Sequence, residues 1–207
     1  MIDEHTVAFA QLGSATLGES GAIPMAPRIK AAWRGGRVSA PAYPVTCAAG
    51  DNLAIHVAVA EAPSGHVLVA SVGSEPERGY WGEVLTTGAE ARGIVGLIID
   101  GGVRDVSALE AHGFPVFSST IALRGATKEH PGRIGGQSLV GDVLVHEGDW
   151  IVADADGVAV VPRARLAEVL ATGQAREAKE AKFFEELRAG KTTVDLLGLD
   201  TKAITRD

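Results

Sequence analysis

The chain has 207 residues, of which 46% are hydrophobic and 22% are charged, a balance typical of a folded globular protein and not of a disordered one. This length is enough for a substantial core that needs no disulfide or metal, so we expect residues 1–207 to form a single domain. The formal net charge of −7 disfavours nucleic acid as a partner, because binding phosphate groups requires clustered lysines and arginines.

Features that would direct a chain to a membrane or to an oxidising compartment are missing from the sequence. The single cysteine, Cys47, excludes an intramolecular disulfide and a multi-thiolate metal site. The first residues are acidic where a signal peptide would be basic. The longest apolar runs, such as 94–99, are far shorter than the roughly 20 residues of a membrane helix. We therefore expect a soluble, cytoplasmic protein with no membrane partner.

The first quarter of the chain has the weakest pattern. Glycines and prolines interrupt residues 1–45, which predicts irregular structure with short helical or extended pieces. A helix is predicted over 51–62, with Asp51 or Asn52 as its N-cap. The side chains predicted to share one face of this helix are Leu53, His56, Val57 and Ala60.

Strands and helices alternate in the middle of the chain. The predicted order is a strand over 67–72, a helix over 81–92, a strand over 94–99, a helix over 103–112 and a strand that starts at 114–117. Gly93 and Gly113 close the two helices, and Gly101-Gly102 is predicted as a turn. Short connections between alternating strands and helices favour parallel strands with right-handed crossovers, so we predict an α/β fold with a parallel βαβαβ core.

The pattern changes after Gly125. Short strands are predicted at 143–146, 150–153 and 158–161, with turns at 147–148 and 156–157, as in a small β-meander. A long segment rich in alanine, glutamate and lysine predicts a C-terminal helix over about 163–189, which we expect to pack on a neighbouring subunit.

Two short motifs are similar to known binding loops. Gly-Lys-Thr at 190–192 resembles the end of a phosphate-binding loop, but it follows a helix and is better interpreted as a helix C-cap. The segment 154–157 resembles a calcium loop without its later acidic positions and is better interpreted as a hairpin turn. No Gly-x-Gly-x-x-Gly follows a predicted strand, and the six histidines form no metal-binding pair.

Three charged residues follow two successive predicted strands. Glu83 lies at the start of one helix, and Arg104 and Asp105 lie at the start of the next, with twenty residues between Glu83 and Arg104. Ligands of open α/β sheets bind outside the carboxyl ends of the strands, where such turns converge, so we expect the three side chains to line one pocket. The alternative is that both carboxylates only favour helix N-termini, with Arg104 paired to one of them.

The motif Gly82-Glu83-Val84-Leu85, followed after twenty residues by Arg104-Asp105, resembles the signature of metal-dependent pyruvate aldolases. These enzymes cleave 4-hydroxy-4-methyl-2-oxoglutarate and 4-carboxy-4-hydroxy-2-oxoadipate, and the regulator of ribonuclease activity A belongs to the same superfamily. Further matching segments are 50–56, 96–101, 113–117, 148–149 and 154–158. The resemblance implies an α/β/β sandwich akin to the swivelling phosphohistidine domain, assembled into homotrimers or hexamers.

The resemblance also implies a role for each residue of the motif. Asp105 would bind Mg²⁺ or Mn²⁺ directly, and Glu83 would hold the metal through water. Arg104 would contact a small 2-oxo acid substrate and stabilise its charge, so the implied catalytic residues are Glu83, Arg104 and Asp105. The general base stays open between a metal-bound water and a carboxylate of another subunit. The implied substrate-binding residues are Gly82, Glu83, Val84, Leu85 and Arg104.

The implied activity is retro-aldol cleavage that releases pyruvate, with oxaloacetate decarboxylation as a side activity. The sequence departs from the family at Ala108, where the aldolases tend to have an acidic residue, and at Gly18-Glu19, where they usually have Ser-Asp. The alternative function is a non-catalytic regulator that binds an RNA-processing enzyme, although those regulators lack the metal aspartate. A quinone methyltransferase is disfavoured because no glycine-rich cofactor loop is present.

Overall fold

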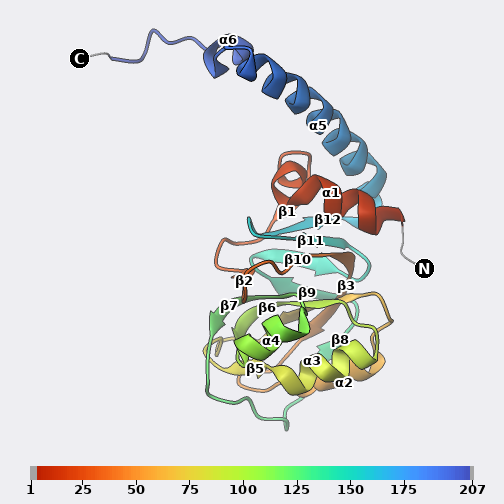
Figure 1. Cartoon of the computed structure of the whole chain (residues 1–207). Helices are drawn as coiled ribbons and strands as arrows, with labels where there is room; N and C mark the ends of the chain where they lie inside the picture. The colour runs from red at the N-terminus through yellow and green to blue at the C-terminus, as the bar shows by residue number, and fades with distance from the viewer. Residues whose placement is uncertain (1–3, 206–207) are drawn as a thin grey trace.

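The computed structural model describes residues 4–205 and shows a curled, mixed ten-stranded sheet with helices on its faces (Figure 1). The strand order is β1-β12-β11-β3-β4-β6-β7-β2, with β5 beside β6 and β8 beside β3, and β9 and β10 pair separately. The strands are β1 (Ile23–Pro24), β2 (Lys30–Ala31), β3 (Val38–Thr46), β4 (Val67–Ser71), β5 (Gly79–Trp81), β6 (Gly96–Val103), β7 (Val116–Ile121), β8 (Arg133–Ile134), β9 (Gln137–Val140), β10 (Val143–His146), β11 (Trp150–Ala153) and β12 (Val158–Val161). The helices are α1 (Glu4–Gly18), α2 (Leu53–Glu61), α3 (Glu83–Ala91), α4 (Val106–His112), the 3₁₀ turn η1 (Arg163–Arg165), α5 (Leu166–Arg188) and α6 (Thr193–Leu197).

The predicted parallel βαβαβ core is confirmed. β3, β4, β6 and β7 are parallel neighbours, and α3 and α4 make the crossovers between β4, β6 and β7. Alternate side chains of these strands face two different cores, as the pleat of a strand requires. Leu68 and Leu97 pack against α2, α3 and α4, whereas Val69 and Ile98 pack against the antiparallel strands β9–β12. The result is a helix layer on a parallel layer on an antiparallel layer, which is the predicted α/β/β arrangement. The likeness to the phosphohistidine domain stays a prediction.

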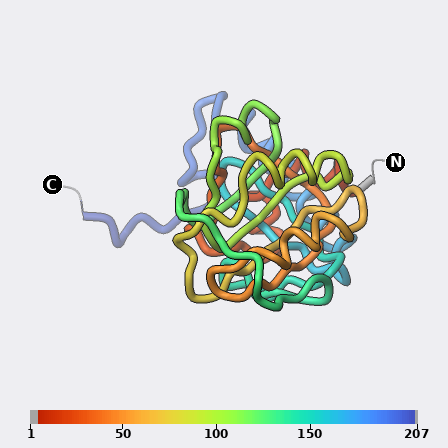
Figure 2. The backbone as a smooth tube through the Cα atoms, turned by 90° about the horizontal axis from the view of Figure 1, so that it is seen from below, coloured from red at the N-terminus to blue at the C-terminus, as the bar shows by residue number. Residues whose placement is uncertain are grey.

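The outer side of the antiparallel strands is covered by α1 and by the start of α5. Trp150 and Val152 of β11 pack against Phe9 of α1 and Val169 of α5. Val169 and Gly173 are the buried residues of α5, so only its first turns lie on the body. The rest of α5 projects away from the body together with α6 (Figure 1), and the chain after α6 extends clear of the body in both views (Figures 1 and 2).

The prediction that residues 1–45 are irregular is wrong for two segments. α1 forms although Gly13 interrupts it with non-helical backbone (φ 75°, ψ 165°), because its apolar side chains pack on β11 and β12. β3 is a central strand although it contains Pro41 and Pro44, which have no N–H to donate. The carbonyl group of Pro44 still accepts a hydrogen bond from the backbone N–H of Gly135 at 2.9 Å.

The structure also corrects a helix face and two boundaries. The buried side chains of α2 are Ala54, Ile55, Ala58 and Val59, not the predicted face that begins with Leu53, which is 36% exposed. Trp81 belongs to β5, and the helix starts at Glu83. The predicted turn at 101–102 is part of β6, because these glycines leave room for Val72 and for the backbone of Arg78 to pack against the strand.

Several smaller predictions are confirmed. The segment 154–157 joins the antiparallel strands β11 and β12 as a hairpin turn. Gly190, with φ 98°, follows the end of α5 as a C-cap glycine. Among residues 4–205, no helix is both long enough and apolar enough to cross a membrane.

Candidate active site

A pocket of about 320 Å³ lies where the turns after the parallel strands converge, as the sequence predicts. Its wall combines the start of α2, strand β5, the start of α3, the turn between β6 and α4, and the loop after β7. The lining residues are Asn52, His56, Gly79, Tyr80, Trp81, Gly82, Val84, Leu85, Arg104, Asp105, Gly125, Ala126 and Lys128.

The carboxylate of Asp105 is fixed at the start of α3. Its Oδ2 atom accepts a hydrogen bond from the backbone N–H of Glu83 at 3.1 Å, and 43% of the side chain is exposed. Asp105 has φ 57° and ψ 34°, a left-handed conformation that costs a non-glycine residue free energy but that aspartate tolerates better than most. The strained backbone therefore presents a carboxylate with open coordination sites at the pocket.

Gly82 allows this close approach. A Cβ atom at this position would collide with Oδ2 of Asp105, so only glycine lets the carboxylate lie against the first turn of α3. The first N–H groups of a helix have no intrahelical acceptor and carry partial positive charge. Val84 and Leu85, which follow Glu83 in that turn, line the pocket, so this helix start is suited to an anionic ligand.

Arg104 brings positive charge to the same wall. Its Nε atom lies 3.9 Å from Oδ2 of Asp105, and 46% of the side chain is exposed. The backbone N–H of Arg104 donates to the carbonyl oxygen of Trp81 at 2.9 Å, which ties the turn after β6 to β5. The structure thus brings Arg104 and Asp105 together at one pocket.

The carboxylate of Glu83 takes a different direction. Its Oε1 atom lies 3.7 Å from Nε2 of His112, in the last turn of α4, and the side chain is absent from the pocket lining. His112 also contacts Glu90 through Nδ1 at 2.8 Å. Glu83 therefore contributes its backbone N–H to the site, and the water-mediated metal role of its carboxylate stays a prediction.

Three further polar side chains, which the sequence did not single out as site residues, line the pocket: Asn52, His56 and Lys128. Asn52 is 5% exposed, donates from Nδ2 to the carbonyl oxygen of Tyr80 at 2.8 Å, and has a buried Oδ1 atom without a hydrogen-bond partner. Lys128 and His56 also line the pocket. Burial of the His56 ring and the positive charge of Lys128 both lower the pKa of His56. Asn52 and His56 lie in the segment 50–56, which resembles the family but indicates no chemistry by itself, and Lys128 lies in none of the family-like segments.

The donor set suits only certain metals. Among residues 4–205, no three histidine, cysteine, aspartate or glutamate side chains are grouped as a metal cage, and Asp105 is the one carboxylate in the pocket lining. Zinc needs three or four protein ligands, whereas Mg²⁺ binds through one or two carboxylates and keeps several waters. The residues present therefore fit Mg²⁺, or the similar ion Mn²⁺, held by Asp105 and by oxygens of a ligand.

Comparison with known proteins identifies the family of the chain. The family described as "RraA-like: Aldolase/RraA" matches residues 12–160. A protein of Halalkalibacterium halodurans named "Putative 4-hydroxy-4-methyl-2-oxoglutarate aldolase" is 35% identical over 144 residues, which cover 70% of this chain and 69% of that protein. A protein of Albidiferax ferrireducens with the same name is 34% identical over 116 residues, which cover 52% and 67% of the two chains.

Solved structures share the fold. An uncharacterized protein from Pseudomonas syringae pv. tomato superimposes with a TM-score of 0.78 at 28% identity, covering 91% of this chain and 87% of that one. The RNA-processing inhibitor RraA from Thermus thermophilus gives a TM-score of 0.64 at 23% identity, covering 72% and 92%. With the matched family over 12–160 and a relative at 35% identity, the chain belongs to the RraA-like (Aldolase/RraA) family.

Proposed function

We propose that the protein is a divalent-metal-dependent lyase that cleaves a small 4-hydroxy-2-oxo acid, such as 4-hydroxy-4-methyl-2-oxoglutarate, to pyruvate and a second carbonyl compound. The observation that carries the proposal is the carboxylate of Asp105, held open at the pocket beside Arg104 and the start of α3. The names of the relatives at 34% and 35% identity support the same reaction class.

The residues of the pocket suit the charges of this reaction. The first N–H groups of α3 would bind the carboxylate next to the 2-oxo group, and Arg104 would lie near the 2-oxo oxygen. In cleavage a general base takes the proton of the 4-hydroxyl group, and the C3–C4 bond breaks to leave a carbonyl group at C4. The electron pair of that bond moves toward the 2-oxo oxygen to give the enolate of pyruvate, which then takes a proton at C3. A divalent ion on Asp105 would supply Lewis-acid stabilisation of that negative charge. Arg104 adds a second positive charge at the same pocket.

Pyruvate release, coupled to lactate dehydrogenase, tests the proposal. The purified protein is assayed with 4-hydroxy-4-methyl-2-oxoglutarate and with oxaloacetate, each in Mg²⁺ or Mn²⁺ and again in EDTA. We expect metal-dependent release above a protein-free metal control, with decarboxylation of oxaloacetate as a side activity. A rate of pyruvate release that resists EDTA would contradict the metal requirement. No pyruvate release from either compound would contradict the proposed aldolase activity.

The family description also includes RraA, so a non-catalytic regulator of an RNA-processing enzyme is the second candidate. A structural relative with 23% identity is described as an RNA-processing inhibitor. This candidate predicts no turnover and a direct interaction with an RNA-processing enzyme that survives Asp105→Ala, whereas the lyase predicts that the same substitution abolishes turnover.

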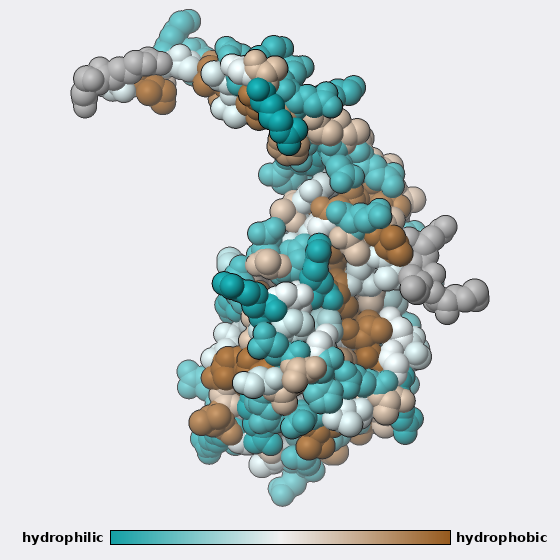
Figure 3. Space-filling model, in the orientation of Figure 1, coloured by the Kyte–Doolittle hydropathy of each residue, from teal (hydrophilic) through white to brown (hydrophobic). Residues whose placement is uncertain are grey.

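The projecting C-terminal segment supports assembly into a homotrimer or hexamer. Polar side chains dominate the exposed surface of α5, with apolar ones between them (Figure 3). Phe184, Leu197, Leu199 and Ile204 are all more than half exposed. Apolar side chains exposed along a projecting segment are typical of a surface that another subunit covers. Light scattering after size-exclusion chromatography tests this assembly, and a monomeric mass would contradict it.

A further inference from the structure

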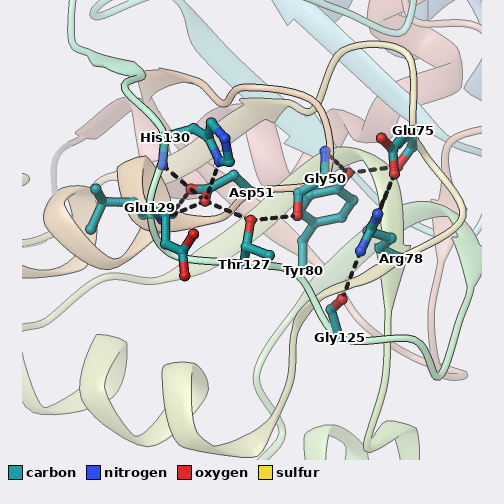
Figure 4. Close-up of polar contacts among 10 residues, drawn as sticks. Gly50, Asp51, Glu75, Arg78, Tyr80, Gly125, Thr127, Glu129 and His130 are labelled. Atoms are coloured by element: carbon teal, nitrogen blue, oxygen red, sulfur yellow. Dashed lines mark hydrogen bonds and ion pairs between the residues drawn. The ribbon is translucent and has the colours of Figure 1, made fainter.

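One buried carboxylate near the pocket has no role in the proposed reaction. Asp51 is 1% exposed and lies directly before the start of α2. Its Oδ1 atom accepts from the backbone N–H of Leu53 at 2.8 Å. Its Oδ2 atom accepts from Thr127 Oγ1 at 2.8 Å and from the backbone N–H groups of Glu129 at 2.6 Å and His130 at 3.1 Å (Figure 4).

Three of these donors belong to one loop. Residues 124–130 follow β7, and Gly125, Ala126 and Lys128 of this loop form one wall of the pocket. The backbone on both sides of Asp51 also pairs with this loop. The N–H of Asn52 donates to the carbonyl oxygen of Thr127, and the N–H of Thr127 donates to the carbonyl oxygen of Gly50, both at 2.9 Å. Asp51 therefore joins α2 to the loop wall on either side of Lys128.

The other end of the loop is held by a second set of contacts. Arg78 donates from Nη1 to the carbonyl oxygen of Gly125 at 3.3 Å and from Nε to Glu75 at 2.7 Å (Figure 4). Tyr80 accepts from the backbone N–H of Gly50 at 3.0 Å and donates to the carbonyl oxygen of Glu75 at 2.6 Å. The end at Gly125 is thus held by Arg78, and the end that contains Lys128 is held by Asp51.

The negative charge on Asp51 strengthens its hydrogen bonds to the loop. Burial disfavours the ionised form, but the hydrogen bonds from Glu129, Leu53, Thr127 and His130 outweigh it and keep the pKa of Asp51 below its usual range. Hydrogen bonds to an ionised acceptor are stronger than those between neutral groups. The carboxylate therefore holds the loop more firmly than a neutral side chain of the same shape.

We infer that Asp51 is a positioning residue, which holds the loop 124–130 so that Lys128 and Ala126 form a fixed wall of the binding pocket. The inference rests on the proposed function for the identity of the ligand, a small 2-oxo acid, and adds a determinant of how tightly that acid is bound. Asp51 lines no part of the pocket itself and acts only through the loop.

Asp51→Asn tests the inference because it keeps the shape of the side chain and removes its charge and one acceptor oxygen. We expect kcat/KM for the 2-oxo acid to fall about tenfold or more, mainly through KM, because a displaced wall weakens substrate positioning. The matched control is Asp149→Asn. Asp149 is also buried and accepts from the backbone N–H groups of His146 and Arg163, both at 2.9 Å, but it lies outside the pocket lining. We expect this control to leave kcat/KM unchanged.

A double-mutant cycle with Lys128→Ala separates positioning from general loss of structure. If Asp51 acts through Lys128, the double variant loses far less activity than the product of the two single losses. Losses that multiply independently would overturn the inference. Thr127→Val, which removes only one donor to Asp51, gives a milder version of the same result and replaces Asp51→Asn if that variant does not fold.

Hydrogen exchange gives a measure that needs no activity. We expect the amides of Glu129 and His130 to exchange about tenfold faster or more in Asp51→Asn, with amides of β11 and β12 unchanged. Unchanged exchange in the loop would overturn the inference. Failure of the proposed function looks different, because the wild-type protein then releases no pyruvate. The cycle is in that case measured on the affinity for oxalate in the presence of Mg²⁺, where independent losses again overturn the inference.

Discussion

Two turns of this protein place an aspartate in the left-handed conformation and use it in opposite ways. Asp105, between β6 and α4, has φ 57°, and Asp142, between β9 and β10, has φ 65°. Both oxygens of Asp142 accept from Arg28, at 2.7 and 3.0 Å, and these bonds lower the pKa of its carboxyl group. Asp105 accepts one backbone N–H and lies 3.9 Å from the guanidinium of Arg104.

The difference teaches that backbone strain alone does not mark a functional residue. In the turn at Asp142 both carboxylate oxygens are paired with Arg28, which also binds Asp100 at 2.7 Å and so joins the hairpin to β6. The turn at Asp105 leaves most of its carboxylate free beside a pocket and a helix N-terminus. Open coordination at a pocket, together with the strain, is what distinguishes the candidate site.

The largest expected effect is the difference in catalytic rate between two variants, each of which removes the charge of one of these aspartates. Asparagine tolerates the left-handed conformation, so Asp105→Asn and Asp142→Asn alter chemistry more than backbone. We expect Asp105→Asn to lower metal-dependent pyruvate release about 10³-fold, because the proposed metal ligand is lost. Asp142→Asn should leave the rate unchanged and lower the Tm through loss of the contact with Arg28. Steady-state kinetics and thermal unfolding of both variants test this prediction. Equal rates for the two variants would contradict a special role of Asp105.

A smaller loss is expected from filling the space beside Asp105. In Gly82→Ala the new Cβ collides with Oδ2 of Asp105, so we expect a loss of about 10- to 100-fold in kcat/KM. Gly88→Ala, in the same helix, is the control. Its Cβ would lie 3.5 Å from Val59, an ordinary contact, and the helix gains up to about 1 kcal/mol from alanine. A fully active Gly82→Ala protein would show that the carboxylate needs no fixed position.

The smallest effect extends the comparison to Asp51, the carboxylate with the most hydrogen bonds of the three. Its pKa is lowered in the folded protein, so the stabilisation it provides is fully present above the unfolded pKa of about 4 and declines progressively as the pH falls from that value toward the lower pKa of the folded protein. We expect the stability difference between the wild type and Asp51→Asn to be largest at pH 7 and to shrink at pH 3. Urea unfolding at the two pH values measures this, and a difference independent of pH would contradict it.

The parallel core was predictable from the sequence because it depends on local signals. Buried strands such as β4 and β6 are continuous apolar runs, and Gly93 and Gly113 mark the ends of the helices between them. β3 was not predictable in this way, since Pro41 and Pro44 disfavour a central strand locally. What stabilises β3 is pairing with β4 on one side and with the distant β11 on the other, which no local pattern reveals.

The site was predictable only as far as topology decides it. Spacing places Arg104 and Asp105 at the same edge as the start of α3, and the structure brings them together. The direction of the Glu83 side chain depends on His112, a contact between two helices that spacing does not determine. Lys128 reaches the pocket through a loop fixed by Asp51, so its place depends on a tertiary contact across the loop.

The pairing of β3 with β11 also sets the order in which the chain can fold during its synthesis. Pro41 pairs with Trp150 and Val38 with Ala153, so this edge of β3 has no partner until most of the protein has left the ribosome. Contacts so distant in sequence form slowly, and an open strand edge is meanwhile a template for aggregation. Chains that stop before residue 150 should therefore accumulate in the insoluble fraction, even though they contain the pocket residues.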